Sequence, residues 1–221
     1  IADERIRGWS KFLQQQSFKT YSKLNQAISD AQANLKTLSA LRQSVQTQTA
    51  ALPDVLASYT QTIDRLLIVP ALASEFTGHG ETVRQLQAYY SFLQGKERAG
   101  IERAVLSNVF ARDAFTPQLF ARFVRLVSEQ DAFLQSFERI ADAQALAAYR
   151  QFQQSAAVQD VSRLREKALQ SDSGFGVSPT DWFAAATERI EALKILEDGQ
   201  QQALLDNASG ILQDTRNELW L

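Results

Sequence analysis

Apolar side chains recur at three- and four-residue steps along most of this 221-residue chain, with polar side chains between them. Such spacing places the apolar residues on one face of an α-helix. In the first fifth of the chain these positions are Leu24, Ile28, Leu35, Leu38, Leu41 and Val45. The segment from Ala2 to about Ala51 contains one glycine and no proline. The pattern predicts one long helix, or two helices in line, with one face packed and much of the circumference in water.

Prolines and glycines mark the next boundaries. Pro53 suits the first position of a helix, and Pro70 is expected to end that helix at Val69 because its ring nitrogen carries no hydrogen. The two glycines that flank His79 predict a turn at 78–80, which is the best candidate for a hinge. No other segment has the composition of a linker, so residues 1–221 are expected to form a single domain.

The rest of the chain predicts five more helices. They are expected at Glu81–Arg112, from Pro117 onward, at Ala143–Gln154, at Val158–Gln170, and from Pro179 to Leu221. Thr116 and Ser178 each precede a proline, which is the pattern of an N-cap followed by the first helical residue. Two glycines inside the first of these helices, Gly95 and Gly100, each cost about 1 kcal/mol relative to alanine. They indicate the close approach of another helix or space for something other than a side chain.

Composition favours an all-α fold and narrows the range of possible functions. Nine glycines and four prolines are few for a sheet with many tight turns. A net charge of −2 with interspersed signs argues against a binder of nucleic acid or of a membrane surface. The chain has no cysteine and one histidine, His79, so it lacks the residues of a thiol nucleophile or a typical metal site. We expect no metal, no cofactor and no enzymatic activity.

The ends of the chain indicate a piece of a longer protein. The sequence has no methionine, and it begins and ends within helical patterns. No run of 18 apolar residues occurs, so any membrane-spanning helix is expected to lie outside these bounds.

The segment Gln94–Ala104 carries the candidate chemistry. It places Arg98 and Arg103, together with Glu97 and Glu102, on a helix whose other residues are mostly apolar. An arginine in such a place normally pairs with a carboxylate, and this is one interpretation. The other is a pocket for a small planar oxyanion, because the guanidinium fork matches the geometry of such an anion.

Three segments of the chain resemble the nitrate- and nitrite-sensing (NIT) family: Lys96–Ala104, Phe110–Glu138 and Gly174–Leu193. The residues that carry the resemblance are Lys96, Glu97, Gly100, Glu102, Arg103, Ala104, Gln130, Trp182, Thr187, Arg189 and Ile190. Near the N-terminus, family members usually carry a glutamate-arginine-glycine-x-serine run. This chain keeps Arg7, Gly8 and Ser10 of that run, but Ile6 stands in place of the glutamate.

The resemblance implies an all-helical sensor built as two four-helix bundles that share long terminal helices. It further implies an extracytoplasmic, periplasmic domain of an inner-membrane protein, placed between two membrane helices of a chemoreceptor, histidine kinase or similar receptor. The family also occurs in soluble regulators of transcription or antitermination. We expect a homodimer in which binding of the ligand displaces the terminal helices.

The same resemblance implies that nitrate or nitrite binds to Arg7, Arg103 and Arg189, which an up-and-down bundle can bring into one interior layer. Gly100 lies three residues before Arg103 and would leave space for the anion.

Some interpretations remain open at this point. Arg163 and Arg165 are alternatives to Arg189 in the pocket, although a solvated face is the expected place for both. Trp182 is predicted to anchor the core rather than to contact a ligand. The competing hypothesis for the whole chain is a helical protein-interaction or spacer bundle, with its arginines in ordinary salt bridges and no small-molecule ligand.

Overall fold

A computed structural model describes residues 2–15 and 20–218. Within these residues the secondary structure consists of α-helices, one short 3-10 helix and a single isolated β-bridge, so the predicted all-α class is confirmed. The chain divides into two compact units, Ile1–Gly78 and His79–Leu221, and the boundary falls in the turn predicted from the glycines around His79.

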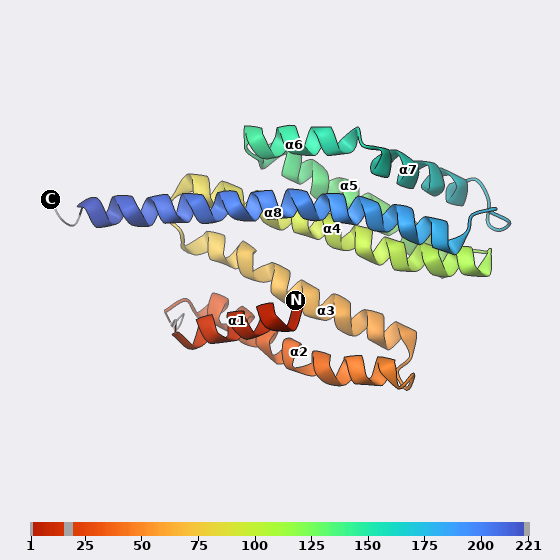
Figure 1. Ribbon diagram of the computed structural model, residues 1–221, viewed down its shortest axis with the longest axis horizontal. Coiled ribbons are helices and arrows are strands. Elements are labelled where there is room, and N and C mark those ends of the chain that lie inside the picture. Colours follow the sequence, from red (N-terminus) through yellow and green to blue (C-terminus); the bar gives the residue numbers. More distant parts are fainter. Residues whose placement is uncertain (1, 16–19, 219–221) are drawn as a thin grey trace. The chain divides into compact units, whose positions relative to one another are not determined.

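The first unit contains α1 (Ala2–Gln15), α2 (Ser22–Gln46), α3 (Leu52–Ala73) and the 3-10 helix η1 (Ser74–Phe76). Helices α2 and α3 pack against each other. The residues of α2 that are buried here are Leu24, Ala27, Ile28, Ala31 and Leu38. Asp3 in α1 pairs with Arg42 near the end of α2 at 2.5 Å, which shows that α1 folds back along α2 (Figure 1). The expectation of one long helix, or two in line, was therefore wrong.

Helix α3 also continues past the residue that was expected to end it. Pro70 lies inside α3, which runs on to Ala73. A proline removes only its own N–H from the helical ladder. The next residues keep theirs, and the backbone N–H of Ser74 donates to the carbonyls of Pro70 and Leu72. Because Pro70 stands in the last turn, its ring weakens the end of the helix without terminating it.

The second unit is a four-helix bundle (Figure 1). Its helices are α4 (Gly80–Arg112), α5 (Pro117–Ile140), α6 (Ala143–Gln153), α7 (Ala156–Leu169) and α8 (Pro179–Glu218). Helix α4 packs against both α5 and α8, while α6 and α7 follow one another along α8 and together fill the fourth position. These bounds agree closely with the predicted ones. Thr116 caps α5 as expected, because its hydroxyl accepts from the backbone N–H of Leu119 at 3.2 Å.

Two apolar clusters form the core of this bundle. The first contains Val105, Leu106, Val109, Phe110, Phe123, Leu126, Val161, Leu164, Ala168, Phe175, Val177, Trp182 and Ala186. The second contains Ala88, Phe92, Ala99, Leu134, Phe137, Tyr149, Phe152 and Leu193. Beside the second cluster, Gly95 of α4 allows a close approach of α5, because a Cβ atom at this position would lie only 2.8 Å from the Leu134 side chain. On α4, α5 and α8 the two clusters occupy successive stretches of the same buried face.

The loop before α8 is fixed by Asp113, the residue that follows α4. The Asp113 carbonyl accepts from the N–H of Gly174 at 3.0 Å, and its carboxylate accepts from the N–H of Phe175 at 2.9 Å. Gly174 and Gly176 adopt positive φ values of 68° and 59°, which glycine tolerates best. The loop thereby places the Phe175 ring in the core and sets the start of α8.

Candidate functional site

Four polar side chains lie between the two apolar clusters, one from each position of the bundle. They are Glu102 of α4, Gln130 of α5, Arg165 of α7 and Arg189 of α8, and we call them the polar layer. Glu102 and Gln130 are each 1% exposed, and Arg189 is 7% exposed. Burying charged and polar groups is costly unless they bind one another. Their contacts therefore decide what the layer can do.

Arg165 holds Glu102 through two parallel hydrogen bonds. Its Nε donates to Oε1 at 2.5 Å and its Nη2 donates to Oε2 at 2.6 Å, the bidentate arrangement of a guanidinium and a planar anion. The expectation of a solvated face was wrong for Arg165, because it lies four residues after Val161 and three before Ala168, on the buried face of α7. For Arg163 it holds, since this side chain is exposed and pairs with Asp160 on its own helix at 3.0 Å.

Gln130 links the other three members of the polar layer. Its amide nitrogen donates to Glu102 Oε2 at 2.9 Å. Its amide oxygen accepts from Arg165 Nη2 at 2.9 Å and from Arg189 Nη1 at 3.0 Å. The three contacts fix the orientation of the amide, because the opposite orientation would turn the NH₂ group toward two guanidinium groups. Sequence reasoning placed Gln130 in a motif but not in the site. A glutamine between Leu126 and Leu134 on the core face of α5 was the available signal.

Arg189 shares the carboxylate of Glu102 at a longer distance. Its Nη1 lies 4.0 Å from Glu102 Oε2. Burial and the nearby charge of Arg165 lower the pKa of Arg189 to about 10, while Glu102, Tyr149 and Asp131 oppose this shift. The group is still protonated at neutral pH. Two guanidinium groups thus face one carboxylate, and the polar layer carries a net positive charge.

Arg103 lies on the same α4–α8 seam but makes different contacts. Its Nη1 donates to the hydroxyl of Thr187 at 2.8 Å, and its guanidinium carbon lies 4.7 Å from the centre of the Phe183 ring. Among the described residues, Arg103 has a hydroxyl and an aromatic ring as partners and no carboxylate. Trp182 is fully buried and its indole N–H donates to the Arg103 carbonyl, which confirms its role as a core anchor.

The other cations of the 94–104 segment form ordinary ion pairs. Arg98 Nε lies 3.2 Å from Glu129 Oε2, and Lys96 pairs with Glu197. The remaining candidate, Gly100, is half-buried, and a Cβ atom built there would have no atom within 4 Å. The salt-bridge interpretation therefore holds for Arg98 and does not describe Arg103.

Arg7 lies on α1 in the first unit, where its side chain is exposed. Its charge helps to lower the pKa of the Asp3 carboxyl, although the hydrogen bond and charge of Arg42 contribute more. A role for Arg7 beside Arg103 and Arg189 stays a prediction.

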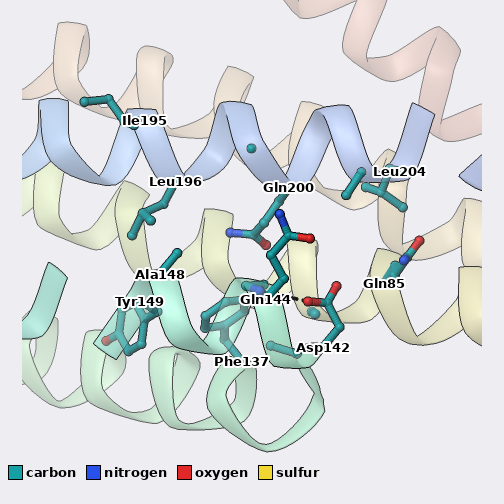
Figure 2. A pocket seen from close by; sticks show the side chains of 15 residues that line it. Gln85, Phe137, Asp142, Gln144, Ala148, Tyr149, Ile195, Leu196, Gln200 and Leu204 are labelled. Carbon is teal, nitrogen blue, oxygen red and sulfur yellow. Dashed lines mark hydrogen bonds between the residues drawn. The ribbon is translucent and has the colours of Figure 1, made fainter. Parts of the chain in front are cut away.

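A cavity of about 240 Å³ opens in the second unit between α4, α6 and α8 (Figure 2). Alanines and a glycine form much of its wall, with Phe137 and Tyr149, and its polar side chains include Gln144, Gln200 and Asp142. Among the described residues that line it, none is a lysine or arginine. The cavity therefore offers no positive charge to a small anion, and Arg103, Arg189 and Gly100 are not part of it.

Two similar proteins are regulators. A nitrate regulatory protein from Klebsiella oxytoca is 30% identical over 224 residues, which cover 100% of this chain and 56% of that protein. The structure of the NasR transcription antiterminator matches 96% of this chain and 57% of the antiterminator with a TM-score of 0.88 and 27% identity. The chain thus spans little more than half the length of each of these proteins.

These relatives correct the expected setting of the domain. They are a regulatory protein and a transcription antiterminator, so the extracytoplasmic receptor domain was wrong, together with its periplasmic location, membrane-anchored parent and role in chemotaxis. The helical patterns at the chain ends were compatible with a continuation into a membrane helix, but they fit a continuation into any further helix equally well. Within residues 2–15 and 20–218, no helix combines the length and apolar character that a membrane span requires.

The exclusion of nucleic acid as a partner is also corrected. It rested on the balanced charge of these 221 residues. A similar protein is a transcription antiterminator, so a balanced charge in these residues does not exclude nucleic acid as a partner.

The family assignment rests on most of the chain. The model of the family described as nitrate and nitrite sensing matches residues 2–205, a range that takes in the motifs around Arg7, Arg103 and Arg189 and the whole polar layer. The chain belongs to the NIT family of nitrate- and nitrite-sensing domains.

Proposed function

We propose that this chain is the anion-responsive part of a regulatory protein, and that nitrate or nitrite binds at the polar layer of the second unit. One observation carries the proposal. Two guanidinium groups, that of the buried Arg189 and that of the partly buried Arg165, share the single carboxylate of Glu102. A small anion would neutralise the remaining positive charge.

The chemistry of the layer suits a planar oxyanion. Nitrate and nitrite present two or three oxygens in one plane, and a guanidinium fork can donate to two of them at once. Arg103, with a hydroxyl and a ring as partners, is a further donor on the same seam. This role of Arg103 and Arg189 is the one predicted from the sequence, and Arg165, named there as an alternative to Arg189, joins them in this proposal.

The polar layer also gives binding a route to an output. Its four members come from α4, α5, α7 and α8, so a change in one contact acts on every position of the bundle. Helix α8 continues from Arg189 to Glu218 and can carry a small displacement along its length. We infer that the output controls transcription, as the name of the NasR transcription antiterminator suggests, and that the chain itself catalyses no reaction.

Thermal unfolding tests the proposal. The midpoint is compared in sodium nitrate, sodium nitrite and sodium chloride at equal ionic strength. A ligand at about one hundred times its dissociation constant stabilises the folded state by about 2.7 kcal/mol, which corresponds to a rise of roughly 5–10 °C for a chain of this size. Midpoints that do not differ between the three salts would favour the spacer hypothesis instead.

Matched variants locate the site. Arg189→Gln and Arg103→Ala remove guanidinium groups of the proposed site, whereas Arg163→Ala removes an exposed arginine that pairs with Asp160. The response to nitrate should be lost or strongly reduced in the first two variants and kept in the third. An equal response in all three would place the anion elsewhere.

A further inference from the structure

We propose that Glu102 is an internal competitor for the anion: its carboxylate takes the place on Arg165 that nitrate or nitrite would take, and binding of the ligand exchanges one for the other. The inference rests on the proposed function, since it concerns the same polar layer. It adds that the affinity for the anion is set by a buried acid and not by the arginines alone.

The geometry of the Glu102–Arg165 pair supports this exchange. A carboxylate and a nitrite or nitrate ion are all planar and can present two oxygens to one guanidinium edge. Arg165 already donates to Glu102 Oε1 and Oε2 from Nε and Nη2 at 2.5 and 2.6 Å. An incoming anion must accept hydrogen bonds from the same edge of Arg165, or from Arg189 in addition to the contacts that Arg189 already makes.

The charges of the layer make the competition unavoidable. Glu102 is 1% exposed, so water screens its charge poorly. An anion bound to Arg165 or Arg189 must lie close to this carboxylate, because Glu102 Oε2 is 2.6 Å from Arg165 Nη2 and 4.0 Å from Arg189 Nη1. The two negative charges repel each other, and both draw on the donors of the same two guanidinium groups.

Gln130 is the positioning residue that joins the two halves of the exchange. Its oxygen accepts from both arginines and its nitrogen donates to Glu102. If Arg165 turns from Glu102 toward the anion, the Gln130 amide keeps its hydrogen bonds to the Glu102 carboxylate and to Arg189. The exchange therefore moves α7 relative to α4 and α5 while the network stays connected.

Removal of the charge of Glu102 is the direct test. Glu102→Gln keeps the size of the side chain and one acceptor oxygen, and it leaves two guanidinium groups without their carboxylate. Titration calorimetry should show nitrate binding about tenfold tighter or more than in the unchanged chain, because the repulsion from a charge a few ångströms away is lost. The matched control is Glu129→Gln on α5, which breaks ion pairs with Arg98 and Arg125 outside the polar layer and should leave the affinity unchanged.

The outcomes separate this inference from the proposed function. If the unchanged chain binds nitrate and Glu102→Gln binds it equally or more weakly, the competition is overturned while the nitrate site stands. If neither protein binds nitrate or nitrite, the proposed function fails and this inference fails with it. Tighter binding in Glu102→Gln and not in Glu129→Gln supports both.

A second measurement applies if Glu102→Gln does not fold. The Nε–H resonance of Arg165, assigned in the unchanged chain by comparison with Arg165→Lys, is followed by NMR during a nitrate titration. The exchange predicts that this resonance shifts with the same midpoint as binding measured by calorimetry. A resonance that stays in place at saturating nitrate means that Arg165 keeps Glu102, and it overturns the proposal.

Discussion

The indole N–H of Trp182 donates to the backbone carbonyl of Arg103 at 3.0 Å. This contact joins the first turn of α8 to the C-terminal third of α4, at the residue whose side chain donates to Thr187. The indole ring is fully buried and lies 5.8 Å from the ring of Phe110. The Trp182 side chain thus fills the core at this end of the bundle and fixes the register of α4 against α8.

Trp182→Phe should therefore destabilise the chain. The phenyl ring fills less of the space and leaves the Arg103 carbonyl without this donor. Loss of the buried hydrogen bond and part of the ring is expected to cost about 2–3 kcal/mol, a fall of roughly 4–12 °C in the unfolding midpoint measured by circular dichroism. A midpoint within about 1 °C of the original would mean that the indole contributes little to the register of α8.

The two arginines of α7 should differ sharply when each is replaced by alanine. Arg165→Ala leaves the buried carboxylate of Glu102 without its bidentate partner, at a cost of about 3–5 kcal/mol in the free energy of unfolding. Arg163→Ala removes only an exposed pair with Asp160 and should change that free energy by less than about 0.5 kcal/mol. Urea denaturation measures both values. Similar losses in the two variants would contradict the assignment of Arg165 to the interior.

The helices of the second unit could be predicted because their signals are local. The N-cap and proline at Thr116 and Pro117 set the start of α5, and the three- and four-residue spacing of apolar side chains set its buried face. The reversal between α1 and α2 could not be predicted in this way. The sequence between Gln15 and Ser22 has neither glycine nor proline to mark a turn.

The composition of the polar layer could be predicted only in part. Arg189 was found through the family motif, but Arg165 was not, because its partners Glu102 and Gln130 lie 63 and 35 residues away in sequence. A charged residue beside an apolar stripe can face either water or the core, and only the packing of α7 on the bundle decides between them. The expected receptor setting came from the family resemblance, and helical periodicity within these residues does not distinguish a receptor domain from part of a regulator.

The two glycines inside α4 should respond in opposite ways to alanine. Gly95→Ala places a methyl group 2.8 Å from Leu134. The overpacking costs about 1–3 kcal/mol, which equals or exceeds the gain of about 1 kcal/mol in helix propensity, so the chain should not become more stable. Gly100→Ala meets no atom within 4 Å and should stabilise the chain by about 1 kcal/mol. Urea denaturation of both variants measures the difference. A nitrate titration of Gly100→Ala decides whether this glycine leaves space for the anion, since an unchanged affinity removes it from the site.

Tyr149 should make the stability of the chain depend on alkaline pH. Burial, helped by the charge of Glu138, raises the pKa of Tyr149 to about 12, against 10.0 for an ordinary tyrosine. The folded state therefore binds the phenolic proton more tightly than the unfolded state does. This contribution to stability is fully present below about pH 10 and is lost as the pH rises toward about 12.

The expected loss is about 1 kcal/mol between about pH 9 and pH 11. Tyr149→Phe has no such proton. Over this pH range the unfolding free energy of the variant should therefore rise by that amount relative to the unfolding free energy of the unchanged chain. The comparison cancels the contribution of Tyr89, whose pKa is also raised to about 12. Arg189, with a lowered pKa, is coupled to Tyr149 by charge, so the measured change belongs to this pair. Urea denaturation at both pH values gives the two differences, and a difference that does not change with pH would mean that the Tyr149 hydroxyl is open to water.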